Sequence, residues 1–239
     1  MVSEEDAKHM EEKEIETSEG LLRAYYREPT GTNALVVFVP GTGSGRDSRR
    51  NRAVAEELWQ GGMGTVLMDL LTPEEGEEPP DGHLDLDSHT RRVLDVVERL
   101  REEATGWLRV GLFGPGTGAA VALNAAIRKP EDIRAVVSRG GRPDLVQDEL
   151  DGVEVPSLFL VAEEDEEALR VSREAVKTIR KEGVAKLEVV AEADHLFEEP
   201  GALQMVAQRS LSWFEEHLVK GQPYSPPEPP GDRATEPEQ

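Results

Sequence analysis

The sequence of 239 residues contains no cysteine, which excludes disulfide bonds, thiolate metal sites and a cysteine nucleophile. No stretch approaches the run of about 18 apolar residues that a membrane-spanning helix needs. The first residues are acidic and polar and lack the apolar segment of a secretion signal. We therefore expect a cytoplasmic protein.

Basic residues, and lysine above all, are scarce. The chain has 49 acidic against 27 basic residues, of which only seven are lysine, and its net charge is −22. Nucleic acids and anionic membranes would repel such a chain, so we exclude both as partners. An acidic, lysine-poor surface suits high salt, where like charges are screened. We predict a halophilic protein whose stability rises toward molar salt; a stability independent of salt would refute this.

The length fits one α/β domain, with a different composition at each end. We expect a flexible acidic arm at residues 1–12 and the folded domain at residues 13–220. Residues 221–239 carry six prolines among acidic and small residues, so we expect a disordered tail there.

Apolar runs typical of strands alternate with helical patterns along the domain. The expected strands are residues 13–17, 21–27, 34–39, 64–70, 109–113, 133–138, 157–161 and 186–190. The expected helices are residues 48–60, 88–105, 117–128, 167–181 and 202–219. This order predicts a doubly wound, mostly parallel sheet with helices on both faces and an antiparallel hairpin at its N-terminal edge. Ligands of such sheets bind beyond the carboxyl ends of the strands.

A strand, a glycine turn and a helix follow one another at residues 108–128. The turn centres on Gly116, between two further glycines, and has the pattern of a nucleophile elbow. Asp165 follows the next-but-one strand and His195 follows the last strand, which is the order nucleophile, acid, base. In that chemistry the carboxylate fixes the tautomer of an imidazole that faces the elbow.

The same turn allows a second interpretation. Residues from Gly114 to Ala119 match the dinucleotide fingerprint G-x-G-x-x-A, and Arg139 ends the next strand, where an NADP-binding protein uses an arginine for the 2′-phosphate. That fingerprint normally opens the fold, whereas two strand–helix units precede it here. It also leaves Asp165 and His195 without a role, so we favour the elbow.

Five segments, residues 41–58, 68–74, 114–120, 136–145 and 193–203, carry a resemblance to a known family. They resemble the dienelactone-hydrolase-like proteins, which are small α/β-hydrolases without a large cap domain. The resemblance implies hydrolysis of esters or lactones by a serine or cysteine with an Asp and a His. Asp165 and His195 fall on the acid and base positions. Relatives have serine or cysteine where this chain has Gly116, and many have histidine where it has Pro40.

Because glycine has no side chain, Gly116 cannot attack a carbonyl carbon or form an acyl-enzyme. Thr117 lies one residue beyond the apex, where we expect its side chain to point away from the base. Ser44, in the glycine-rich loop after the third strand, and Ser138 are remote substitutes. The sequence therefore predicts a degenerate triad.

Water can take the place of the missing nucleophile. His195 would deprotonate a water molecule beside Gly116, and Asp165 would orient the imidazole. The backbone N–H groups of Thr42 and Thr117 would stabilise the oxyanion. The alternative is a site that binds a ligand without turning it over.

Arginines gather on the predicted ligand-binding edge of this acidic chain, at residues 46–52 and 139–142. Each of them alone is expected to form an ion pair with a carboxylate on the surface. As a group they predict a site for an anionic small molecule, a carboxylate or a phosphate. The residues we assign to it are Arg46, Arg49, Arg139 and Arg142. We expect no metal and no cofactor, and solvent exposure of the remaining histidines, His9, His83, His89 and His217.

Overall fold

The computed structural model describes residues 10–76, 84–104 and 108–220. Most of the expected acidic arm, the expected tail and residues 77–83 of the acidic loop lie outside the described residues, as do His9 and His83. None of the helices in the described ranges combines the length and the apolar character that a membrane span requires.

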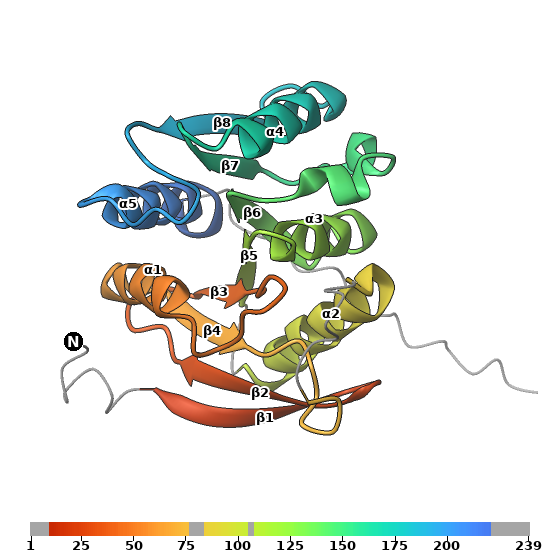
Figure 1. The fold of residues 1–239 in the computed structure, drawn as a ribbon. Coiled ribbons are helices and arrows are strands. Elements are labelled where there is room, and N and C mark those ends of the chain that lie inside the picture. The colour runs from red at the N-terminus through yellow and green to blue at the C-terminus, as the bar shows by residue number, and fades with distance from the viewer. Residues whose placement is uncertain (1–9, 77–83, 105–107, 221–239) are drawn as a thin grey trace, which may run out of the picture.

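One mixed sheet of eight strands forms the centre of the described chain (Figure 1). Its strands are β1 (Glu11–Thr17), β2 (Gly20–Arg27), β3 (Ala34–Phe38), β4 (Gly64–Met68), β5 (Arg109–Pro115), β6 (Ile133–Arg139), β7 (Ser157–Ala162) and β8 (Ala185–Val190). They lie in the order β1-β2-β4-β3-β5-β6-β7-β8. β2 is antiparallel to β1 and to β4, and all other neighbours are parallel. The predicted fold class is confirmed, including the edge hairpin.

Helices cover both faces of the sheet (Figure 1). They are α1 (Arg49–Gln60), α2 (Leu86–Glu103), α3 (Gly118–Arg128), α4 (Glu166–Thr178) and α5 (Ala202–Phe214), which continues as a π-helical turn, Glu215–Val219. α1 and α5 lie on one face, and α2, α3 and α4 lie on the other. Two 3₁₀ turns, Pro143–Val146 and Leu150–Gly152, connect β6 to β7.

Short polar side chains fix where three of the helices begin. Ser48 caps α1 by accepting the N–H of Asn51, and Asp85 caps α2 in the same way. Asp165 caps α4, accepting the N–H of Ala168 at 3.0 Å. Each cap satisfies an N–H that has no partner inside its helix. Asp165 is therefore held in place independently of any role in chemistry.

The core consists of two layers, one on each face of the sheet. Every residue of β3, β4 and β7 is buried, as expected for strands covered on both sides. On one face α1 and α5 contribute side chains such as Val54 and Phe214. On the other face α2 and α3 contribute side chains such as Val96 and Leu123. The loops at the carboxyl ends of the parallel strands thus extend from a sheet that is closely packed on both faces.

Element boundaries differ from the prediction where pairing or burial decides them. β1 begins at Glu11 rather than at residue 13, because Glu11 pairs with Tyr26 of β2. α4 ends at Thr178 rather than at residue 181, because Ile179 adopts an extended backbone and is buried. α2 begins two residues earlier than predicted and places His89 on its covered face. The predicted exposure of His89 is wrong, since its side chain is only 7% exposed.

Candidate functional site at the carboxyl ends of the strands

The turn between β5 and α3 has the shape of an elbow. Gly116, at its apex, has a φ of +53°, in the left-handed region. Its N–H donates to the carbonyl oxygen of Arg139 at 3.2 Å, and its own carbonyl accepts the N–H of Arg142 at 3.0 Å. The end of β6 therefore fixes the apex through the backbone.

The three glycines of the turn differ in what requires them. A Cβ at Gly118 would overlap the carbonyl oxygen of Val39, and a Cβ at Gly114 would overlap that of Gly118. Backbone packing therefore excludes side chains at both positions. A Cβ at Gly116 would meet no atom within 4 Å. The apex has room for the side chain that it lacks.

Asp165 and His195 form a hydrogen-bonded pair, with His195 Nδ1 at 2.7 Å from Asp165 Oδ2. A carboxylate only accepts hydrogen bonds, so Nδ1 carries the proton of the neutral ring and Nε2 is the basic nitrogen. The side chain of Asp165 is 13% exposed, and that of His195 is 70% exposed. The pair thus combines a covered carboxylate with an accessible imidazole.

The loop that carries His195 is ordered on both sides of the imidazole. The Asp194 carboxylate accepts the N–H of Leu196 at 2.8 Å, and the N–H of Asp194 donates to Glu199 at 3.0 Å. Phe197 is buried in the core layer of α1 and α5. These contacts limit the motion of the His195 backbone, so the imidazole is presented from a fixed position.

The two N–H groups predicted to stabilise an oxyanion are in different states. The N–H of Thr42 donates to the Thr117 hydroxyl at 2.7 Å, and the Thr42 hydroxyl lies 2.9 Å from the same oxygen. The N–H of Thr117 donates to no described residue. In this conformation only one of the two donors is available to a ligand.

A small pocket of about 170 Å³ joins these elements. Gly116 and His195 both line it, together with Arg139, Arg50 and Ser44. Of the two serines predicted as substitutes for the missing nucleophile, Ser44 lines this pocket. Ser138 lies within β6, and its buried hydroxyl has no hydrogen-bond partner.

Of the four arginines assigned to an anion site, only Arg139 lines this pocket. Arg46 donates to Glu12 at 2.7 Å and lies 3.3 Å from Asp69. Arg142 forms a two-point hydrogen-bonded pair with Asp144. Arg49 is exposed and lines a wider cavity of about 930 Å³. The sequence places these arginines near the strand ends, but carboxylates bind two of them, Arg46 through distant residues and Arg142 through the nearby Asp144.

Arg139 is 8% exposed. Burial lowers its pKa to about 10, and the positive charge of Arg50 adds to this effect, so the guanidinium is still charged at neutral pH. Arg50 belongs to the arginine group at residues 46–52 but is not one of the four residues assigned to the anion site, although its position in the sequence gives a signal. It precedes Val54 and Leu58 by four and eight residues, which places it above the buried face of α1.

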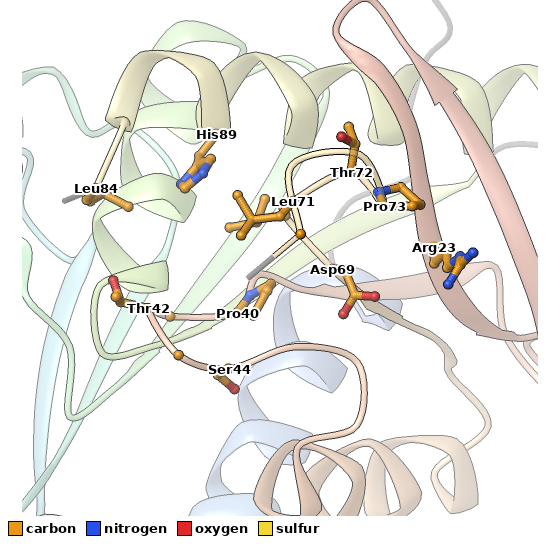
Figure 2. A pocket seen from close by; sticks show the side chains of 14 residues that line it. Arg23, Pro40, Thr42, Ser44, Asp69, Leu71, Thr72, Pro73, Leu84 and His89 are labelled. Carbon is orange, nitrogen blue, oxygen red and sulfur yellow. The ribbon is translucent and has the colours of Figure 1, made fainter. Parts of the chain in front are cut away.

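A larger cavity of about 520 Å³ lies across the glycine-rich loop and shares Gly41, Thr42 and Ser44 with the small pocket. Figure 2 shows His89 pointing from α2 into this cavity, with Leu71 beside it. Burial lowers the pKa of His89, which favours the neutral ring. The two cavities together provide a small compartment with two arginines and a larger one lined by both apolar and polar side chains. In the described ranges, no three His, Asp or Glu side chains are placed to hold one metal ion.

A twisted sheet covered on both faces, an elbow after β5 and an Asp–His pair after later strands define an α/β hydrolase. The chain belongs to the dienelactone hydrolase family, whose model matches residues 22–218. This confirms the resemblance inferred from the sequence. The dinucleotide interpretation of the turn stays a prediction.

Solved structures agree with this assignment, whereas a similar protein of known sequence carries the name of another activity. A crystal structure of dienelactone hydrolase from Anabaena variabilis is 39% identical, covers 87% of this chain and 99% of that chain, and has a TM-score of 0.82. Est1E from Butyrivibrio proteoclasticus shares the fold at 16% identity, with a TM-score of 0.72 over 86% of this chain and 98% of that chain. A Mycobacterium tuberculosis protein named "Putative phosphoribosyl transferase" is 45% identical over 191 residues, 80% of this chain. This chain spans only 42% of that protein's length.

Proposed function

We propose that this protein hydrolyses a small carboxylic ester or lactone by direct attack of water, without forming an acyl-enzyme. The observation that carries the proposal is an intact Asp165–His195 pair on the same pocket as an elbow apex with open space. The space that a side chain would fill at Gly116 suits a water molecule with polar neighbours. An accessible imidazole on that pocket suits a general base.

In the proposed reaction, water adds to the carbonyl carbon to form a tetrahedral intermediate, which then expels the alcohol, and no bond to the protein forms. His195 Nε2 takes a proton from water while the water oxygen attacks, and Asp165 stabilises the imidazolium that forms. The N–H of Thr117 donates to the oxyanion. Collapse of the intermediate expels the alkoxide, which takes the proton from His195. In a lactone, the new hydroxyl and the new carboxylate remain in one product.

The same arrangement limits the rate. General base catalysis contributes about 10²–10⁴-fold, whereas removing the nucleophilic serine of a well-studied protease costs on the order of a millionfold. We therefore expect a slow hydrolase whose rate still depends on His195.

A second candidate function is ligand binding without turnover. It is supported by the hydrogen bond between the Thr42 N–H and the Thr117 hydroxyl, which occupies one of the two oxyanion donors. This function predicts small molecules that raise the melting temperature and are recovered unchanged.

A panel of short-chain p-nitrophenyl esters and small lactones, assayed with wild type and His195→Ala, separates the two functions. Hydrolysis predicts that the wild-type rate exceeds the His195→Ala rate at least about a hundredfold on some substrate. Equal rates on every substrate would reject hydrolysis. His217→Ala is a matched control, because His217 packs against Trp213 at the end of α5 and should leave the rate unchanged.

A further inference from the structure

The pocket beside Gly116 is positively charged in a chain whose net charge is −22. Its lining includes two arginines, Arg139 and Arg50, and the imidazole of His195. No Asp or Glu is among the eleven described residues that line it. Elsewhere arginines pair with carboxylates, as Arg46 and Arg142 do. The excess of positive charge here is local and specific.

The guanidinium of Arg139 lacks an acceptor. Its Nη1 is buried and forms no hydrogen bond, and the side chain makes no ion pair with any residue that the structure describes. Its aromatic neighbour, Phe113, lies with the ring centroid 5.8 Å from the guanidinium carbon. Buried charged groups are normally paired, because an unpaired charge loses its hydration without compensation. The pocket therefore presents a guanidinium charge that no described residue neutralises.

Arg50 adds a second charge that is only weakly engaged. It donates to the carbonyl oxygen of Leu196 at 3.5 Å and lies 3.9 Å from the Glu198 carboxylate, both long contacts. It is close enough for its charge to affect Arg139. Two like charges on one small pocket repel each other, and an anion that contacts both relieves the repulsion.

We infer that this pocket binds the oxoanion group of a small molecule, a phosphate or a carboxylate, through Arg139 and Arg50. This binding role rests on the proposed function, because that function places the hydrolysis in the same pocket. A volume of about 170 Å³ suits one charged group, and the remainder of the molecule would extend into the adjoining cavity of about 520 Å³. Guanidinium groups bind both oxoanions through charge-assisted hydrogen bonds. The group is either a phosphate carried by the substrate or a carboxylate, including the one that hydrolysis releases.

Isothermal titration calorimetry with inorganic phosphate and, separately, with acetate tests the inference at constant low ionic strength. We expect one site on the wild type for at least one of the two probes. Arg139→Met keeps most of the side-chain volume without the charge and should weaken binding by about ten- to a hundredfold, the usual effect of a lost hydrogen bond to a charged group. Arg50→Met should weaken it too and does not depend on the folding of the Arg139 variant. The preferred probe identifies the oxoanion.

Arg173→Met is the matched control, because it removes the same charge from an exposed position of α4 that does not line the pocket. Its binding should equal that of the wild type. Absence of binding for both probes, or binding that is unchanged in both Arg139→Met and Arg50→Met, would overturn the inference. The titration requires no turnover, so phosphate or acetate binding without His195-dependent hydrolysis would keep the pocket and reject the proposed function. His195-dependent hydrolysis without phosphate or acetate binding would keep the proposed function and reject the anion-binding pocket.

Discussion

The backbone N–H of Thr42 donates to the hydroxyl of Thr117 at 2.7 Å, across the entrance of the elbow. Thr117 directly follows the apex, and Thr42 belongs to the glycine-rich loop after β3. In α/β hydrolases these two positions supply the oxyanion donors. Here the hydroxyl of Thr117 accepts the hydrogen bond that the Thr42 N–H would otherwise donate to an oxyanion. For the proposed hydrolysis, this contact and the missing side chain at Gly116 both lower the rate that we expect.

Removing the Thr117 hydroxyl should free that donor. In a Gly116→Ser background, we expect Thr117→Val to raise ester hydrolysis at least about tenfold, since one oxyanion donor contributes about a hundredfold or more in a related chemistry. Thr117→Ser keeps the hydroxyl and should match Gly116→Ser alone. Initial rates with a p-nitrophenyl ester measure the effect; no gain with valine would show that the Thr42 N–H does not face the oxyanion.

Gly116→Ser should restore nucleophilic catalysis, because a Cβ at this position would meet no atom within 4 Å and the Asp165–His195 pair is intact. Gly116→Ala introduces the same backbone strain without a hydroxyl. Both variants should be less stable than the wild type by about 1–2 kcal/mol in urea unfolding, since φ is +53°. The serine variant should hydrolyse esters faster than the alanine variant. Equal rates would mean that His195 does not reach the apex.

Asp165 has two separable roles, one for each carboxylate oxygen. Oδ1 caps α4, and Oδ2 holds His195. Asp165→Asn keeps the capping ability and should leave the free energy of unfolding nearly unchanged, whereas Asp165→Ala should lose about 1 kcal/mol. Both should lower His195-dependent hydrolysis about a hundredfold or more. A fully active asparagine variant would contradict the role of the carboxylate in orienting the imidazole.

The carboxylate of Glu75 should contribute to stability at neutral pH and lose this contribution in acid. Hydrogen bonds from Arg92, at 2.6 and 2.7 Å, lower the pKa of Glu75 from 4.5 to about 2. Because the folded-state pKa lies below that of the unfolded chain, the stabilisation is complete above pH 4.5 and decreases as the pH falls toward 2. Glu75 is partly exposed, so we expect about 1 kcal/mol or less.

Urea unfolding at pH 7 and at pH 3 measures this contribution. The stability difference between the two pH values should be smaller in Glu75→Gln than in the wild type. Glu174→Gln, which removes the same charge from an exposed pair with Arg170, serves as the control. An equal pH dependence in wild type and Glu75→Gln would show that the Arg92 pair is not coupled to folding.

Much of the architecture follows from the sequence, because burial on both faces leaves continuous apolar runs in strands such as β3 and β7. The positions of Asp165 and His195 were also predictable, since these residues lie in the loops that follow β7 and β8. Their contact itself comes from the structure. The ends of strands and helices depend on partners that are distant in sequence, as with Glu11 and Tyr26.

The anion-binding residues show what local pattern cannot provide. Arg46 and Arg139 both lie close to the strand ends, but only the structure reveals that Asp69 and Glu12 bind Arg46. Arg139 has no such partner among the described residues and stays available to a ligand. Ion pairing between residues far apart in the sequence therefore decides which arginine is free, and a single sequence does not record it.

Intact-protein mass spectrometry during steady-state turnover of a p-nitrophenyl ester distinguishes hydrolysis by water from hydrolysis through an acyl-enzyme. The wild type should form product with no mass added to the protein, and His195→Ala should lose this activity. Gly116→Ser should show the added acyl group under the same conditions. An acyl adduct on the wild type, for example at Ser44, would contradict direct attack by water.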